Sequence, residues 1–343
     1  MNVDRFQALV GRFPQLRIAL VGDFFLDRYF HIDPALAEIS IETGLPVYNV
    51  VKVRSQPGAA GTVLNNLVAL GAGRVHAVGF CGEDGEGYEL RQALQKNPGV
   101  ELDRFITAHD RHTPVYGKPL VVTQTEAPRE LNRLDIKNWS PTPEPLQRQI
   151  AEHVLALAGQ VDAFIVLEQV DQEHTGVITP PVLAALAQVQ QQYPKAVIIA
   201  DSRRGLSHFP PVTLKMNGHE LAHMLGYGST SLEVAKTHAE ELANRNGHPV
   251  FVTLAEHGIL GAYPGEPACH VPAFPVRGPI DVVGAGDSVT ATLACVLAAG
   301  ASLQEAMEMA MAASSIVVHE LGTTGTASPA EMADLLGVAP SRA

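Results

Sequence analysis

Short apolar runs alternate with amphipathic stretches along most of the chain. The first run, Arg17 to Gly22 (RIALVG), predicts a buried strand that is followed directly by an acidic loop. Helices are then predicted over 144–158, 181–192, 286–299 and 303–319, and strands over 163–167, 196–200, 212–216 and 249–254. Strands that alternate with helices of this length indicate a parallel sheet covered on both faces. We therefore expect an α/β fold: a three-layer α/β/α doubly wound, mostly parallel sheet.

Two segments break this regular alternation. Residues 27–53 and 115–134 contain short pieces in which apolar and polar positions alternate, which is typical of strands with one face in solvent. The second segment has a turn signal near Ala127-Pro128, and its pattern fits a hairpin that joins the first segment. We expect a small β-sheet lid, inserted over about 27–53 and 112–135, in a chain whose residues 1–343 form a single domain.

Composition narrows the classes of function. The chain has 343 residues, of which 46% are hydrophobic and 17% charged, so it can bury a large core and is not a mainly disordered chain. The formal net charge is −12, and no cluster of Lys or Arg forms a footprint for nucleic acid or an anionic membrane. Neither is an expected partner. The three well-separated cysteines and the lack of a signal-like or membrane-spanning apolar stretch indicate a cytoplasmic protein.

The segment with the most chemical information is DVVGAGD, residues 281–287, directly before a long apolar helix. Small residues let backbone N–H groups point at an anion, and the helix dipole adds positive potential there. A carboxylate beside such an anion hole can accept the proton of an attacking hydroxyl. We expect Gly284, Ala285 and Gly286 to form the anion hole and Asp287 to be the catalytic base. Taken alone, the segment is also typical of a helix N-cap after a tight turn.

This segment resembles the D-T-x-G-A-G-D signature of the ribokinase-like, or PfkB, family of carbohydrate kinases. The resemblance covers nearly the whole chain in order and spacing, and it includes Gly22-Asp23, the loop 57–61, NGHE at 217–220, VTL at 252–254 and the tail at Gly322. Residues 39–47 and 322–324 further resemble the heptose-phosphate kinase domain of ADP-heptose synthases. The resemblance implies ATP-dependent phosphorylation of a hydroxyl on a sugar or sugar phosphate.

The resemblance also implies roles for individual residues. The substrate would contact Asp27, Gly58, Ala59 and Thr62. The nucleotide would contact Asn217, Thr253, Glu256 and Gly258. Glu220 would arrange Mg²⁺ through water, and a monovalent cation such as K⁺ would lie near Asp281, Val283, Gly322 and Thr326. The implied cofactors are therefore ATP and Mg²⁺, with K⁺ as a further candidate. The half-exposed apolar strands of the lid predict a homodimer that forms through the lid.

Some positions depart from the family pattern. The family commonly has G-G-A-A-N in its substrate loop, whereas this chain has GAAGT from Gly58 to Thr62, before a helix predicted over 62–70. An amide that would bridge sugar hydroxyls is thus replaced by a hydroxyl. Ala255 stands where Gly is usual, and Val282-Val283 replaces one or two threonines. The sequence leaves a heptose phosphate, a hexose phosphate, a pentose and a nucleoside open as substrates.

One motif indicates a different chemistry. HELAH at residues 219–223 is an HExxH pattern, which on a helix places His219 and His223 one turn apart to bind Zn²⁺ beside a general-base Glu220. A zinc metallopeptidase also needs a third ligand, for which Glu233 or Glu241 is available. Against this interpretation, Glu220 also belongs to the NxxE pattern at residues 217–220, which gives it a different role.

A third hypothesis is a family member without catalytic activity that binds a sugar or a nucleotide. The presence of Gly284, Gly286 and Asp287 argues against it, because a protein that only binds its ligand has no chemical need for the base.

Overall fold

A long, mostly parallel sheet forms the centre of the molecule. The computed structural model describes residues 1–123, 127–226 and 231–339. The strands of this sheet are, in spatial order, β17 (Cys269–Val271), β16 (Ile259–Ala262), β15 (Val250–Thr253), β14 (Thr213–Asn217), β13 (Val197–Ser202), β12 (Ala163–Glu168), β1 (Arg17–Gly22), β6 (Arg74–Gly82) and β7 (Val100–Glu101), and β8 (Phe105–Ala108) also pairs with β6. All neighbours from β15 to β7 are parallel, and β16 and β17 are antiparallel. The mostly parallel sheet predicted from the sequence is confirmed.

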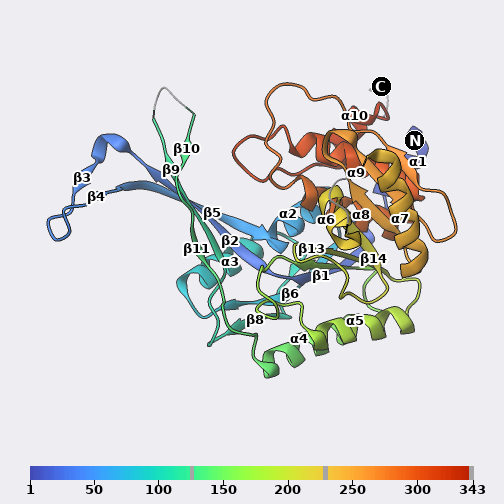
Figure 1. Cartoon of the computed structure of the whole chain (residues 1–343), viewed down its shortest axis with the longest axis horizontal. Helices are drawn as coiled ribbons and strands as arrows, with labels where there is room; N and C mark the ends of the chain where they lie inside the picture. Colours follow the sequence, from blue (N-terminus) through green and yellow to red (C-terminus); the bar gives the residue numbers. More distant parts are fainter. Residues whose placement is uncertain (124–126, 227–230, 340–343) are drawn as a thin grey trace.

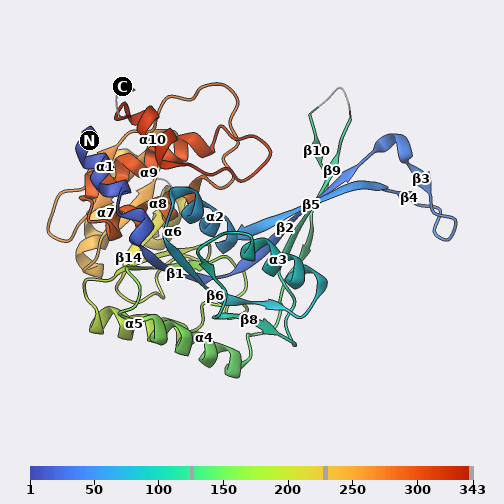
Figure 2. The same cartoon turned by 180° about the vertical axis from the view of Figure 1, so that it is seen from behind.

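Helices cover both faces of this sheet (Figures 1 and 2). One face packs against α1 (Val3–Val10), α2 (Ala60–Leu70), α3 (Gly85–Gln95), α8 (Ala285–Ala298), α9 (Leu303–Val317) and α10 (Pro329–Leu336). The other face packs against α4 (Glu144–Leu157), α5 (Pro180–Gln192), α6 (Gly218–Leu225) and α7 (Leu232–Asn246). The residues of β1 point alternately to the two faces. Ile18 and Leu20 pack against the first set of helices, and Ala19 and Val21 pack against the second. The three-layer α/β/α arrangement follows from this alternation.

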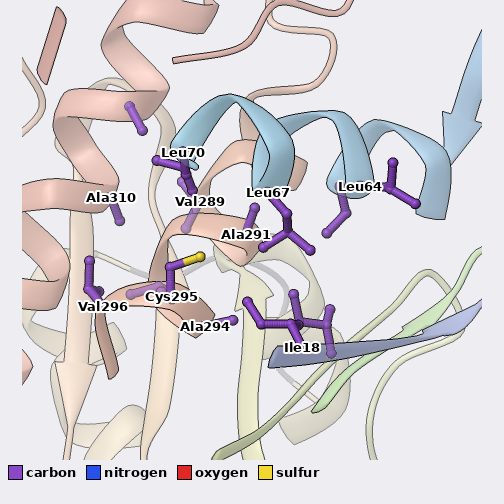
Figure 3. Packing of buried hydrophobic residues seen from close by; sticks show 14 of the residues in the cluster. Ile18, Leu64, Leu67, Leu70, Val289, Ala291, Ala294, Cys295, Val296 and Ala310 are labelled. Carbon is purple, nitrogen blue, oxygen red and sulfur yellow. The ribbon is translucent and has the colours of Figure 1, made fainter. Parts of the chain in front are cut away.

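Tight packing fixes the position of α8 (Figure 3). Val289 of α8 and Leu67 of α2 are fully buried in the same core as Ile18 of β1. The small side chains of Ala291 and Ala294 allow α8 to approach its neighbours closely. Burial of each large apolar side chain contributes about 1.5–3 kcal/mol, so the first turn of α8 is held rigidly at the carboxyl edge of the sheet.

A second, smaller sheet forms the lid, which projects away from the body of the molecule (Figure 1). Its strands are β10 (Arg129–Glu130), β9 (Val115–Val121), β2 (Phe24–Ile32) and β5 (Val50–Ala59), with β11 (Leu134–Ile136) also paired to β9. A two-stranded ribbon of β3 (Glu38–Ile39) and β4 (Pro46–Val47) stands at its tip. The predicted hairpin is confirmed, because β9 runs antiparallel to β10 and β11; residues 124–126 lie outside the described residues.

Two local predictions are wrong at this point of the chain. The acidic loop expected after β1 is absent from the described structure, because β2 begins at Phe24 and places Asp27 within a strand. Phe24, Phe25 and Leu26 are buried there, and the backbone continues to pair with β5 and β9. Helix α2 begins at Ala60 rather than at Thr62. No helix within the described ranges has the length and hydrophobicity that a membrane crossing requires.

Candidate active site

Asp287 lies in the first turn of α8, where the structure places the GAG segment directly before it. Gly284 is the N-cap, and its φ of +86° is a backbone conformation that favours glycine. The N–H groups in the first turn of a helix have no acceptor within the helix, and the helix dipole makes this end electropositive. Gly286 and Asp287 therefore present backbone donors beside a carboxylate.

The environment of Asp287 makes its carboxyl group easy to protonate. Burial is the main cause that raises the pKa of Asp287 to about 7, and the negative charge of Asp201 raises it further. Lys215 and Arg203 act in the opposite direction. The charge of Asp27 in the lid also raises this pKa, so the two predicted catalytic and substrate-binding carboxylates lie close enough to interact. A carboxylate with a pKa near neutrality is suited to general-base catalysis.

Asp201 and Lys215 form a buried ion pair below the anion hole that the sequence did not predict. Lys215 Nζ lies 2.7 Å from Asp201 Oδ2, and the Thr290 hydroxyl donates to the same oxygen at 3.1 Å. A Cβ atom at Gly286 would lie 3.2 Å from Lys215 Nζ, so the ammonium group directly underlies the first turn of α8. Burial acts to lower the pKa of Lys215, but attraction to Asp201, Asp287 and other carboxylates leaves it raised. The site therefore contains a fixed positive charge.

Further cations surround the lid side of the site. Arg203, just beyond β13, donates to the Tyr116 hydroxyl at 2.9 Å, and Arg133 lies over the Tyr116 ring at 4.4 Å. Arg54 of β5 lies over the Tyr29 ring at 3.9 Å. Within the described part of the chain, neither Arg54 nor Arg203 has a carboxylate at ion-pair distance. These unneutralised guanidinium groups make the lid side of the site electropositive.

Asp27 is buried on the inner face of the lid. Its Oδ2 accepts from Lys118 Nζ at 3.1 Å, whereas Arg28 pairs instead with two glutamates of α3. Its Oδ1 is buried without a hydrogen-bond partner among the described residues, so it can accept a further hydrogen bond. A Cβ atom at Gly58 would lie 2.5 Å from this oxygen, so only glycine permits the contact between β2 and β5.

Two further predicted substrate residues lie at the start of α2. Ala59 directly follows Gly58, precedes α2 with a φ of +53° and is partly exposed. Thr62 lies in the first turn of α2 and is only 2% exposed.

Asn217 and Glu220 form a capping box at the start of α6. The Asn217 side chain accepts from the Glu220 N–H at 2.9 Å, and Glu220 Oε2 accepts from the Asn217 N–H at 2.7 Å. Burial raises the pKa of Glu220, and the negative charge of Asp201 raises it further. The positive charges of Lys215 and Arg203 lower it. Glu220 thus faces the same charges as Asp287 and keeps Oε1 available, in accord with a hard-oxygen site for Mg²⁺.

The predicted nucleotide turn is a hairpin between β15 and β16. Thr253 ends β15 directly beside Asn217 of β14, so these two residues lie together. Gly258 has a φ of +92°, and a Cβ there would collide with the backbone of β17. Glu256 is largely exposed and lies 3.8 Å from the neighbouring His257 side chain. Ala255, where glycine is usual in the resembled family, has a φ of +50°.

The predicted monovalent-cation residues are brought together in part. The Asp281 carboxylate accepts from the Val283 N–H at 3.0 Å and from the Gly322 N–H at 3.3 Å. The Thr326 N–H donates to Glu320 in the same loop, and no contact joins Thr326 to Asp281 among the described residues. Asp281 therefore joins the segment before α8 to the loop that follows α9.

The HELAH segment does not form a metal site in the described residues. His219 and His223 are exposed on α6, and Glu220 is engaged in the capping box. No group of three His, Cys, Asp or Glu residues in the described ranges is arranged to hold a metal ion.

Solved structures define the class of this protein. Arabidopsis thaliana ribokinase complexed with ribose and ATP superposes with a TM-score of 0.69 at 19% identity, over 94% of this chain and 98% of that one. Escherichia coli phosphofructokinase-2 in complex with substrates and products gives the same TM-score at 21% identity, with the same shares of both chains. The fold is therefore ribokinase-like, with a large α/β body and a smaller lid sheet.

Sequence relatives refine this class. Residues 32–331 match the family described as pfkB family carbohydrate kinase. The chain is 33% identical to bifunctional protein HldE of Gluconobacter oxydans over 310 residues, covering 90% of this chain and 62% of that protein. It is also 33% identical to HldE of Pseudomonas fluorescens SBW25 over 330 residues, covering 93% and 63%. The chain spans just under two thirds of the length of these relatives. It belongs to the pfkB family of carbohydrate kinases.

Proposed function

We propose that the enzyme transfers the γ-phosphoryl group of ATP to a hydroxyl of a phosphorylated sugar, with Asp287 as general base. The observation that supports this most directly is the position of Asp287, whose pKa is raised to about 7, in the electropositive first turn of α8. Asp287 would accept the proton of the sugar hydroxyl, and the backbone N–H groups of Gly286 and Asp287 together with Lys215 would stabilise the charge on the transferred group. The Ala285 N–H, predicted to belong to the anion hole, donates instead to the Val282 carbonyl at 3.3 Å.

The residues present fit Mg²⁺ better than they fit K⁺. Glu220 and Asp201 supply carboxylate oxygens near Asp287, and Mg²⁺ bound there would neutralise charge on the nucleotide phosphates. We propose K⁺ only near Asp281, where Val283 and Gly322 are also gathered. Exchange of K⁺ for Na⁺ in the turnover assay tests this cation requirement.

The charges of the lid favour a phosphorylated sugar over a neutral one. Arg54 and Arg203 have no carboxylate partner within the described residues, and Lys118 is neutralised by Asp27 alone. Guanidinium groups bind phosphate through several N–H donors at once. The resemblance of residues 39–47 and 322–324 to the heptose-phosphate kinase domain of ADP-heptose synthases supports a heptose phosphate as the first substrate to try.

The deciding experiment measures ADP formed from Mg·ATP with a panel of sugars, sugar phosphates and nucleosides. We expect a sugar phosphate to stimulate ADP formation. We also expect kcat/KM to fall as the pH drops below about 7, because a protonated Asp287 cannot accept a proton.

Asp287→Asn should lower kcat in the same assay by roughly 100-fold or more, since it removes the base. Asp4→Asn, on the exposed surface of α1, is the matched control. Near-normal turnover of Asp287→Asn, or no stimulation by any acceptor, would contradict the proposal.

A further inference from the structure

Two side chains of β5, Arg54 and Gln56, join the lid to the loop formed by residues 322–324. Gln56 Nε2 donates to Thr324 Oγ1 at 2.7 Å, and the Thr323 hydroxyl donates to Gln56 Oε1 at 3.3 Å. Arg54 donates to Gln56 Oε1 at 2.7 Å and to the Gly322 carbonyl at 3.2 Å. These bonds link the lid to the opposite end of the sequence.

The same loop supports the anion hole. The Cβ position of Gly284 would lie 3.4 Å from Thr324 Cβ, so Thr324 packs directly on the N-cap of α8. The Gly322 N–H and the Val283 N–H both donate to the carboxylate of Asp281. Movement of the loop would therefore displace the backbone that precedes Asp287.

The lid end of this series of contacts is the substrate face. Gln56 and Asp27 are register partners across β5 and β2, as are Arg54 and Tyr29, so all four lie on one face of the lid. Lys118 donates to both Asp27 and Tyr29, and Tyr29 lies under the Arg54 guanidinium. Contacts thus run without a break from the buried carboxylate of Asp27 to the first turn of α8.

We propose that Arg54 and Gln56 are positioning residues that couple the lid to the phosphate end of the site. A sugar held at Asp27 fixes β5, which fixes the loop 322–324 and thereby the N-cap Gly284. This inference rests on the proposed function and adds that the anion hole is complete only while the lid is in place. Such coupling restricts phosphoryl transfer to the state in which the acceptor is bound.

Kinetics of a double-mutant cycle test the coupling. Thr324→Val keeps the shape of the side chain but removes the acceptor hydroxyl, and Gln56→Leu removes the other partner. Each should lower kcat about fivefold to tenfold with the KM for ATP unchanged, and the double variant should lose no more than the worse single variant. Thr237→Val, on the exposed face of α7, makes the same change without a role in the site. Additive losses, or effects confined to the KM for the sugar, would overturn the inference.

Hydrogen exchange with Mg·ADP separates this inference from the proposed function. We expect Mg·ADP to slow amide exchange at residues 281–287 and also in β5 of the parent protein. In Thr324→Val, protection should persist at 281–287 but disappear from β5. Binding of Mg·ADP without any response in β5 of the parent would overturn the coupling alone. Failure of Mg·ADP to bind would overturn the proposed function together with the inference built on it.

Discussion

The negative charge of the Asp287 carboxylate is useful in catalysis but lowers the stability of the folded protein. Burial and the nearby charges of Asp201 and Asp27 raise its pKa to about 7, so its ionised form is destabilised in the folded protein. The partly compensating charge of Lys215 is itself held by Asp201. A site that keeps a carboxylate base buried beside an anion hole therefore lowers the stability of the folded protein.

This cost predicts that Asp287→Asn stabilises the protein at alkaline pH. Because the folded pKa is raised above that of the unfolded chain, ionisation lowers stability progressively as the pH rises from about 4 to about 7. The variant should match the parent near pH 4 and exceed it by about 1–3 kcal/mol at pH 8. Urea unfolding at both pH values measures this difference. Equal stability at pH 8 would show that the carboxylate is well solvated.

Individual site residues differ in how far the sequence reveals them. The small residues before Asp287 stand next to it in the chain, so one segment predicts the helix start. In the sequence, Asp201 looks like any polar residue near the end of a strand, and Lys215 like any residue inside one. They pair only because β13 lies beside β14, which the sequence does not reveal. The carboxyl edge of a parallel sheet is a general signal for such residues, but it does not say which strands are neighbours.

Among the elements, the contact between β2 and β5 controls the substrate end of the site. These strands pair along their whole length, and Gly58 leaves room for the buried oxygen of Asp27. The sequence predicts both strands from their alternation. It does not predict their register, because which residues lie opposite each other depends on how the two strands pair in the folded chain. It also does not predict that the lid strands extend to Phe24 and Ala59.

Gly58→Ala should impair sugar binding selectively. The added methyl group would meet Asp27 Oδ1 at 2.5 Å, so the carboxylate must move away from its position. We expect the KM for the sugar phosphate to rise more than about tenfold with little change in the KM for ATP. Gly85→Ala, where the new Cβ meets no atom within 4 Å, is the matched control. A parallel rise in both KM values would indicate general disruption instead.

At the scale of the whole molecule, the outer face of the lid is apolar and unusually exposed. Val53, Leu134 and Ile136 are 50%, 66% and 39% exposed, and Ile41 in the tip ribbon is 99% exposed. Exposed apolar strands of this kind mark association sites. We propose that two copies of the chain pack through their lids, as the sequence pattern predicts.

Val53→Glu should therefore convert a dimer into a monomer. A carboxylate buried between two apolar lids would lack a partner, which costs several kcal/mol. Light scattering coupled to size-exclusion chromatography measures the mass directly. Val234→Glu, at a 42% exposed valine on α7, provides the control. A parent protein that is monomeric, or a Val53→Glu variant that remains dimeric, would reject the lid interface.

The lid is assembled from two excursions of the chain, one between β1 and α2 and the other between β8 and α4. Each excursion leaves and rejoins the same edge of the central sheet (Figure 2). Only the base of the lid, at Phe24, Leu26 and Val115, enters the core that holds α8. Sequence changes in the lid beyond these residues leave the core of the body intact. Natural selection can therefore diversify the accepted sugar in a lineage while the body is inherited unchanged, provided that the contacts of Arg54 and Gln56 with the loop 322–324 are kept.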